Sequence, residues 1–179
     1  EFDYVDYPSD SLPSFVFVGR LMKAKGIESY LKLAERIKKE FPDAVFHVVG
    51  SMEEDYTNQL KDLVDQNVIK YHGSMHTVKP IYQDVHAIIH PTLYHEGLSN
   101  VLLDVASTGR AILASNIPGC QETFIEGETG YGFNPHDFNA MIDTVRAFIK
   151  LPYSIKKTMG FKGRDYVNKH FNRSTVIQK

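Results

Sequence analysis

Two short turns of this chain combine charged side chains with glycine. Glu96 lies in a glycine-containing turn, and a second acid, Asp104, follows eight positions later on an expected helix. Arg20 and Lys25 lie in another turn, residues 19–26, which has a glycine at each end. A guanidinium binds phosphate oxygens bidentately and a lysine adds a mobile point charge. Two cations and a helix N-terminus suit a diphosphate, and acids with an asparagine suit sugar hydroxyls, so the turns predict a nucleotide-sugar site.

The elements that position these turns alternate between strand and helix. We predict strands at 14–18, 44–49, 68–72, 85–89, 111–114 and 130–133, and helices at 28–41, 56–65, 78–82, 99–108, 137–150 and 153–170. This alternation indicates an α/β fold, a Rossmann-like three-layer sandwich with a parallel sheet and right-handed crossovers. The carboxyl ends of parallel strands meet at one edge of the sheet, so we expect both turns to lie at that edge.

The expected helix 99–108 has one polar side. At about 100° per residue, Asp104 lies roughly 130° from the centre of the apolar stripe, and Asn100 is its neighbour one turn earlier. The stripe itself consists of Val101, Leu102, Val105 and Ala106. Taken alone, a solvated acid explains Asp104 and a basic surface loop explains residues 19–26. A binding site is favoured because Asp104 and residues 19–26 are expected to lie at the same edge of the sheet.

Length and composition set limits on the function. The 179 residues suffice for one domain, and a net charge of −2 gives no electrostatic case for nucleic acid. No apolar run approaches the roughly 20 residues of a membrane span. The single cysteine, Cys120, is assigned a structural role and fits a reducing compartment. The chain begins with Glu1, so we expect a piece of a longer protein in which residues 1–13 form a linker or domain edge.

Several other chemistries lack their motifs. No Asp-x-Asp motif is present, so we expect no metal. The histidine pairs spaced by four straddle expected strands and lack a His-Glu-x-x-His context. No Gly-x-Gly-x-x-Gly follows the first strand, which argues against a nicotinamide dehydrogenase. The pair Lys156-Lys157 is assigned to a solvated helix face.

Several motifs in this order resemble the retaining glycosyltransferases of family 4, which have the two-domain GT-B fold. They are Gly19-Arg20, Lys25-Gly26, His72-Gly73, Glu96-Gly-Leu-Ser-Asn100 with the acid eight residues on, Pro118-Gly-Cys-Gln-Glu122 and Glu128-Thr-Gly130. The resemblance covers residues 14–170 and is to the carboxy-terminal, donor-binding half. The acceptor-binding half, which would precede residue 1, is absent from this chain.

The resemblance implies a role for each matching residue. Arg20 and Lys25 match the pair that holds the donor diphosphate and stabilises the leaving phosphate, and Glu96 matches the acid that contacts hydroxyls of the transferred sugar. Asp104 stands where the family usually has a glutamate that binds the ribose, and it is one methylene shorter. The remaining expected substrate-binding residues are Gly19 and Asn100, the base-side pair His72 and Gly73, and the turn Gly97, Leu98 and Ser99, whose N–H groups meet phosphate and sugar.

We therefore expect residues 14–179 to be the nucleotide-sugar-binding domain of a retaining hexosyl- or N-acetylhexosaminyltransferase. The family implies bacterial polysaccharide biosynthesis (capsule, lipopolysaccharide or exopolysaccharide), a nucleotide diphosphate sugar as donor, and no cofactor or metal. It also implies a cytoplasmic protein whose missing half supplies the acceptor site and any peripheral membrane contact, so this chain alone should be inactive. Two alternatives stay open. One is a non-catalytic nucleotide-sugar-binding homologue, which Asp104 favours. The other is a sugar-nucleotide epimerase of the same fold, which the arrangement of Glu96 and Asp104 disfavours.

Overall fold

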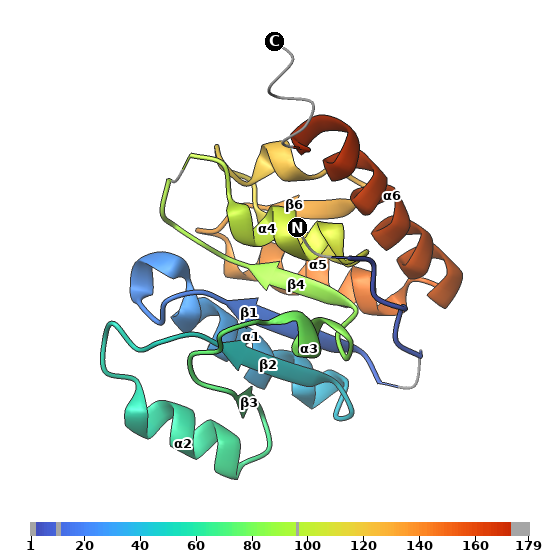
Figure 1. Ribbon diagram of the computed structural model, residues 1–179. Helices are drawn as coiled ribbons and strands as arrows, with labels where there is room; N and C mark the ends of the chain where they lie inside the picture. Colours follow the sequence, from blue (N-terminus) through green and yellow to red (C-terminus); the bar gives the residue numbers. More distant parts are fainter. Residues whose placement is uncertain (1–2, 10–11, 96, 173–179) are drawn as a thin grey trace.

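Six parallel strands form one central sheet in the computed structural model, which describes residues 3–9, 12–95 and 97–172 (Figure 1). The strands are β1 (Ser14–Val18), β2 (Val45–Val49), β3 (Lys70–Tyr71), β4 (Ala87–His90), β5 (Ala111–Ser115) and β6 (Gly130–Phe133). Their order in the sheet is β3-β2-β1-β4-β5-β6, and every neighbouring pair is parallel. The predicted α/β, Rossmann-like architecture is confirmed.

Helices cover both faces of the sheet (Figure 1). They are α1 (Ile27–Glu40), α2 (Thr57–Asp65), α3 (Lys79–Tyr82), α4 (Asn100–Ser107), α5 (Phe138–Lys150) and α6 (Tyr153–Phe171), with the short 3-10 helices η1 (Lys23–Lys25) and η2 (Gln121–Thr123). Along β1, Phe15 and Phe17 pack in a core with α1, α2 and α5, whereas Val16 packs in a second core with α3, α4 and α6. This alternation follows the two-residue period of a strand and explains why the strands are apolar on both faces.

The structure corrects three local predictions. Strand β3 has two residues instead of five, because the N–H groups of Val68 and Ile69 bond to the carbonyl of Leu63 at the end of α2, at 2.8 and 3.4 Å. The two 3-10 helices were not predicted. Lys156 does not lie on a solvated face, since it is only 4% exposed and its Nζ lies 5.8 Å from the centroid of the Phe148 ring.

The described residues before β1 pack onto the domain around a fully buried arginine. Arg110 donates from Nη1 to the carbonyl of Val5 (2.9 Å), from Nη2 to that of Asp6 (2.7 Å) and from Nε to that of Tyr82 in α3 (2.8 Å). Carbonyl oxygens thus solvate a guanidinium that would be costly to bury unpaired. Sequence reasoning assigned residues 1–13 to a linker or domain edge and did not anticipate this contact.

Candidate functional site

The two turns singled out in the sequence follow β1 and β4, which are neighbours in the sheet. From β1 the chain continues to β2 on one side, while β4 and β5 lie on the other. In a sheet of this order, the crevice at the carboxyl ends of the two central strands is where ligands bind. The β1–α1 loop and the β4–α4 loop therefore form the candidate site.

Backbone contacts join these two loops directly. The Leu93 N–H donates to the Ala24 carbonyl at 2.8 Å, and the Thr92 hydroxyl donates to the same oxygen at 3.4 Å. Gly26 has a left-handed φ of 82°, and a Cβ added there would lie 2.0 Å from the Pro91 carbonyl oxygen. The close approach of the loops therefore depends on glycine at this position. Loops whose contacting residues are 65 to 69 positions apart in the sequence are thereby held at one edge of the sheet.

The two cations of the β1–α1 loop are close enough to influence each other. Arg20 is exposed and Lys25 is half-buried. Burial lowers the pKa of Lys25, and the charge of Arg20 lowers it further. The Lys25 Nζ lies 4.7 Å from the centroid of the Tyr94 ring, a cation–π distance that places the ammonium beside the β4–α4 loop. An incoming diphosphate would relieve the repulsion between the two cations.

A neutral histidine lies at the end of β4 near this pair. His90 is 5% exposed, and burial, followed by the charge of Lys25, lowers its pKa to about 4. Its Nδ1 is buried and has no hydrogen-bond partner among the described residues. The positive charge of this part of the site thus comes from Arg20 and Lys25 and not from His90. In the sequence, His90 stands out only as one member of a histidine pair spaced by four, with His86.

The turn before α4 is positioned by Ser99. Its side chain caps the helix by accepting a hydrogen bond from the Leu102 N–H at 3.4 Å, and its own N–H donates to the Gly119 carbonyl at 2.8 Å. Within this structure the Ser99 N–H is thus engaged by the Gly119 carbonyl, and its expected contact with phosphate or sugar stays a prediction. Gly97 and Leu98 are exposed, and their N–H groups remain the expected contacts from this turn. Glu96 lies outside the described residues.

Asp104 lies off the apolar stripe of α4, as the helical wheel predicted. Leu102, Val105 and Ala106 are buried, whereas Asn100 is exposed and Asp104 is half-buried. Burial raises the pKa of Asp104, so this acid is less solvated than an ordinary surface carboxylate. Burial also raises the pKa of Tyr82 in α3, and the charge of Asp104 raises it further.

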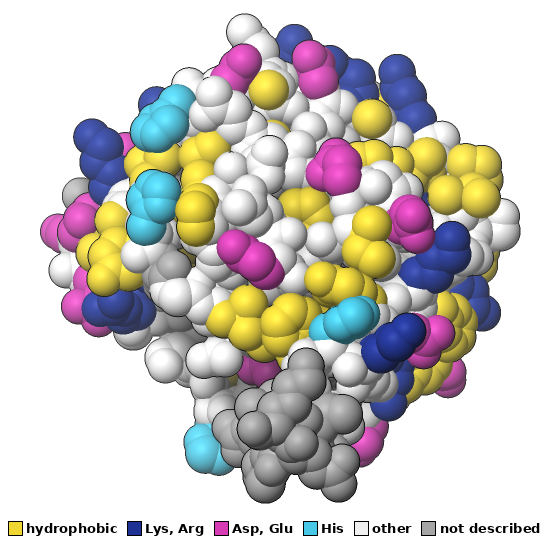
Figure 2. All heavy atoms as spheres, turned by 90° about the horizontal axis from the view of Figure 1, so that it is seen from above, with side chains coloured by type: hydrophobic (Ala, Val, Ile, Leu, Met, Phe, Trp, Pro, Cys, Tyr) yellow, Lys and Arg dark blue, Asp and Glu magenta, His cyan; other side chains and the backbone are white. Residues whose placement is uncertain are grey.

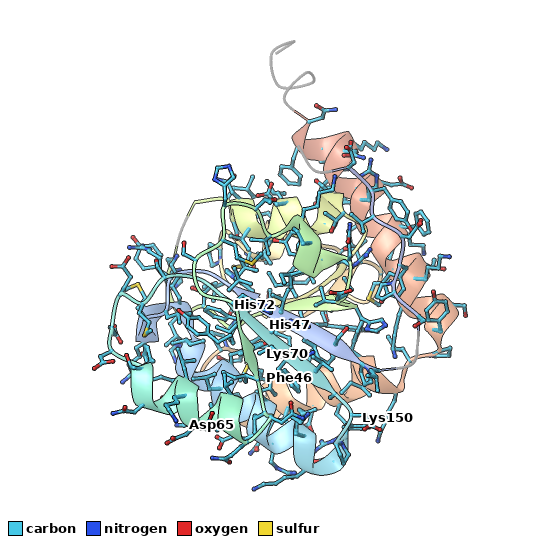
Figure 3. All side chains as sticks on the ribbon, turned by 60° about the horizontal axis from the view of Figure 1, so that its bottom comes forward. Phe46, His47, Asp65, Lys70, His72 and Lys150 are labelled. Atoms are coloured by element: carbon cyan, nitrogen blue, oxygen red, sulfur yellow. The ribbon has the colours of Figure 1, made fainter. Side chains whose placement is uncertain are left out.

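Two histidines form a pair, His47 in the middle of β2 and His72 directly after β3 (Figure 3). His47 Nδ1 and His72 Nε2 are 2.8 Å apart, with an angle of 17° between the ring planes. Burial lowers the pKa of His47 to about 4, with His72 adding to the effect, and burial also lowers the pKa of His72. Both are neutral at pH 7, and His72 is exposed beside Gly73. Sequence reasoning found His72 but missed His47, because their contact depends on strand pairing.

The described residues offer no ready site for a metal ion. No cluster of three or more His, Cys, Asp or Glu side chains suited to a metal ion occurs among the described residues. Figure 2 shows apolar and charged side chains of both signs interspersed on the face seen from above. Within the described residues, no helix is both long and apolar enough to cross a bilayer.

Cys120 is 3% exposed and burial raises its pKa to about 11, so its thiol is unreactive at neutral pH.

Comparison with known proteins identifies the family. The family model described as Glycosyl transferases group 1 matches residues 12–150. The chain belongs to this family. A similar protein from Staphylococcus aureus, the capsular polysaccharide biosynthesis glycosyltransferase CapM, is 26% identical over 169 residues, which cover 91% of this chain and 43% of CapM.

Two solved structures share this fold. HepE from Anabaena in complex with UDP matches with a TM-score of 0.84 and 18% identity, over 99% of this chain and 53% of HepE. The C-terminal domain of a Francisella tularensis group 1 protein, LpcC, matches with a TM-score of 0.76 and 20% identity, over 96% of this chain and 89% of that domain. The expected GT-B resemblance is confirmed, and the chain spans about half or less of CapM and HepE.

Proposed function

We propose that this chain is the donor-binding half of a retaining glycosyltransferase that takes its sugar from a nucleotide diphosphate. The observation that carries the proposal is the cationic β1–α1 loop, held against the loop that leads into α4 at the β1–β4 crevice. HepE, a protein of the same fold, was solved with UDP. The role of CapM in capsular polysaccharide biosynthesis supports a bacterial polysaccharide as the product.

The chemistry of sugar transfer explains the division of roles. Breaking the bond from the anomeric carbon to phosphate leaves negative charge on the diphosphate, and Arg20 with Lys25 would stabilise it. One preorganised donor of this kind is typically worth about 3–4 kcal/mol in the transition state. Glu96 would contact the hydroxyls of the transferred sugar, Asp104 the ribose, and His72 with Gly73 the base side. The cations would neutralise the leaving group without a metal.

The proposal for the whole protein assigns the acceptor site to a second domain that is not part of this sequence. In a two-domain enzyme, holding the acceptor hydroxyl near the anomeric carbon contributes roughly 7–11 kcal/mol by effective-molarity arguments. Residues 14–179 would then bind the donor but transfer no hexose or N-acetylhexosamine by themselves. We place the whole protein in the cytoplasm, with any peripheral membrane contact made by the other half.

Calorimetric titration of the 179-residue chain with UDP and other nucleoside diphosphates tests this function. We expect binding in the presence of a chelator and no gain on adding magnesium. Binding that appears only with magnesium would contradict the role given to Arg20 and Lys25. Rapid glycosyl transfer by this chain alone would contradict the division into two halves.

A further inference from the structure

The 3-10 helix η1 is capped by a side chain from a different loop. The N-cap residue Met22 provides no side-chain hydrogen bond. Instead, the first N–H of the helix, that of Lys23, donates to Glu54 Oε2 at 3.1 Å. Glu54 lies in the loop between β2 and α2. A carboxylate at this position satisfies one of the N–H groups that every helix leaves unpaired at its start.

Glu54 is itself held by a buried tyrosine. The Tyr56 hydroxyl lies 2.9 Å from Glu54 Oε2 and 3.2 Å from Glu28 Oε1, in the first turn of α1. The Tyr56 side chain is 7% exposed, so its ring is fixed by packing. The carboxylate that caps η1 therefore has a defined position even though it lies at the surface.

Backbone hydrogen bonds join the same two loops. The Leu21 carbonyl accepts from the N–H groups of Glu53 (3.2 Å) and Glu54 (3.1 Å), and the Leu21 N–H donates to the Ser51 carbonyl at 2.8 Å. A Cβ added to Gly50 would lie 1.7 Å from the Gly19 carbonyl oxygen. The β1–α1 loop is thus supported on this side by the β2–α2 loop and on the other by the β4–α4 loop. Glu54 contributes the side-chain hydrogen bond on the β2–α2 side.

We propose that Glu54 is a positioning residue for diphosphate binding. By capping η1, it holds the turn that carries Arg20 and Lys25 in the geometry in which both cations converge. This inference rests on the proposed function, since it concerns the same diphosphate. If only a fraction of the molecules hold the turn in the conformation that binds the ligand, the apparent affinity is reduced by that fraction.

Electrostatics and positioning predict opposite results for the loss of Glu54. Removing a negative charge near Lys23 should strengthen the attraction for a diphosphate if charge alone matters, because the local field becomes more positive. Loss of the cap should weaken binding, because the turn loosens. Glu53 provides a matched control: it is the neighbouring exposed glutamate, and its side chain makes no hydrogen bond to the described residues. Glu53→Ala changes the charge equally and leaves the cap in place.

The test is titration of the 179-residue chain and its Glu54→Ala, Glu54→Gln and Glu53→Ala variants with UDP, pyrophosphate and uridine, beside a thermal unfolding curve for each. We expect Glu54→Ala to weaken UDP and pyrophosphate binding roughly fivefold, the order expected for one lost helix cap, and to leave uridine binding unchanged. Glu54→Gln keeps an acceptor oxygen and should restore most of the affinity. Glu53→Ala should bind UDP at least as tightly as the unaltered chain.

The outcomes separate this inference from the proposed function. If the unaltered chain binds neither UDP nor pyrophosphate, the proposed function is wrong and the role of Glu54 is wrong with it. If the chain binds UDP but Glu54→Ala binds it equally or more tightly, only the positioning role is overturned. Equal weakening of UDP and uridine, or a Glu54→Gln variant as weak as Glu54→Ala, would also overturn it, because each result indicates an effect other than capping.

Discussion

Replacing Gly26 with alanine tests how firmly the two loops of the site are joined. Gly26 has a φ of 82°, and its added Cβ would lie 2.0 Å from the Pro91 oxygen and 2.6 Å from the Pro91 carbonyl carbon. The left-handed conformation costs an alanine about 1–2 kcal/mol. Displacing packed backbone costs about 1–3 kcal/mol more, by analogy with overpacked cores. We therefore expect Gly26→Ala to lower the free energy of unfolding by about 2–5 kcal/mol.

Gly127 offers a control with the same backbone conformation and no clash. Its φ is 75°, and nothing lies within 4 Å of an added Cβ. Gly127→Ala should therefore cost only the conformational term, about 1–2 kcal/mol. Urea unfolding, monitored by circular dichroism, measures the loss in free energy of unfolding for both variants. Titration of the folded variants with UDP then shows whether only Gly26→Ala weakens UDP binding. Equal losses of stability in the two variants would refute the close contact between Gly26 and Pro91.

Three further predictions concern single residues of the site. Arg20→Ala should weaken UDP binding far more than uridine binding in calorimetry, because a guanidinium aimed at phosphate gains nothing from the nucleoside; equal losses would indicate an effect through the fold. Asp104→Ala should weaken nucleotide binding with little change in the midpoint of urea unfolding, and Asp104→Glu should bind the nucleotide normally. If Asp104→Ala failed to fold, Asp104 could not lie outside the apolar stripe of α4. His90 has a pKa of about 4 in the folded chain against 6.5 as its ordinary value, so the unfolded chain binds the extra proton and stability falls as pH drops from 6.5 to 4. His90→Leu should make that fall shallower, and an unchanged slope in urea titrations across this range would refute it.

The layered architecture could be predicted because its signals are local. Apolar residues at helical spacing mark α1, α4 and α5, and the short β-rich runs between them mark the strands, so only the ends differ by a residue or two. The exception is β3, where two residues that look like strand are bonded to the end of α2. The pattern of apolar residues within a segment does not show which carbonyl group of a neighbouring helix will accept a hydrogen bond from it.

The site was predictable in its location and not in its internal contacts. The placement of both turns at one edge follows from the parallel topology, which the alternation of elements indicates. The contacts of Gly26 with Pro91, of His47 with His72 and of Lys23 with Glu54 join residues that are 65, 25 and 31 positions apart. Such pairs depend on loop conformation and strand register, and no spacing rule in the sequence identifies them. The hydrogen bond of the Ser99 N–H to the Gly119 carbonyl, 20 positions away, was likewise not foreseen.

The buried Arg110 has a mechanical consequence. Its guanidinium binds the carbonyls of Val5 and Asp6 on one side and that of Tyr82 on the other, and the Tyr4 ring stacks on Phe161 of α6 at 4.8 Å. A pull on residues 3–9 would load these contacts together rather than one after another, so the segment should resist peeling until several fail at once. Because Tyr82 belongs to α3 and Phe161 to α6, the same load would reach both helices and, through Arg110, the start of β5. Tension on the chain ahead of β1 would therefore be shared between β5 and the helices that cover this face of the sheet.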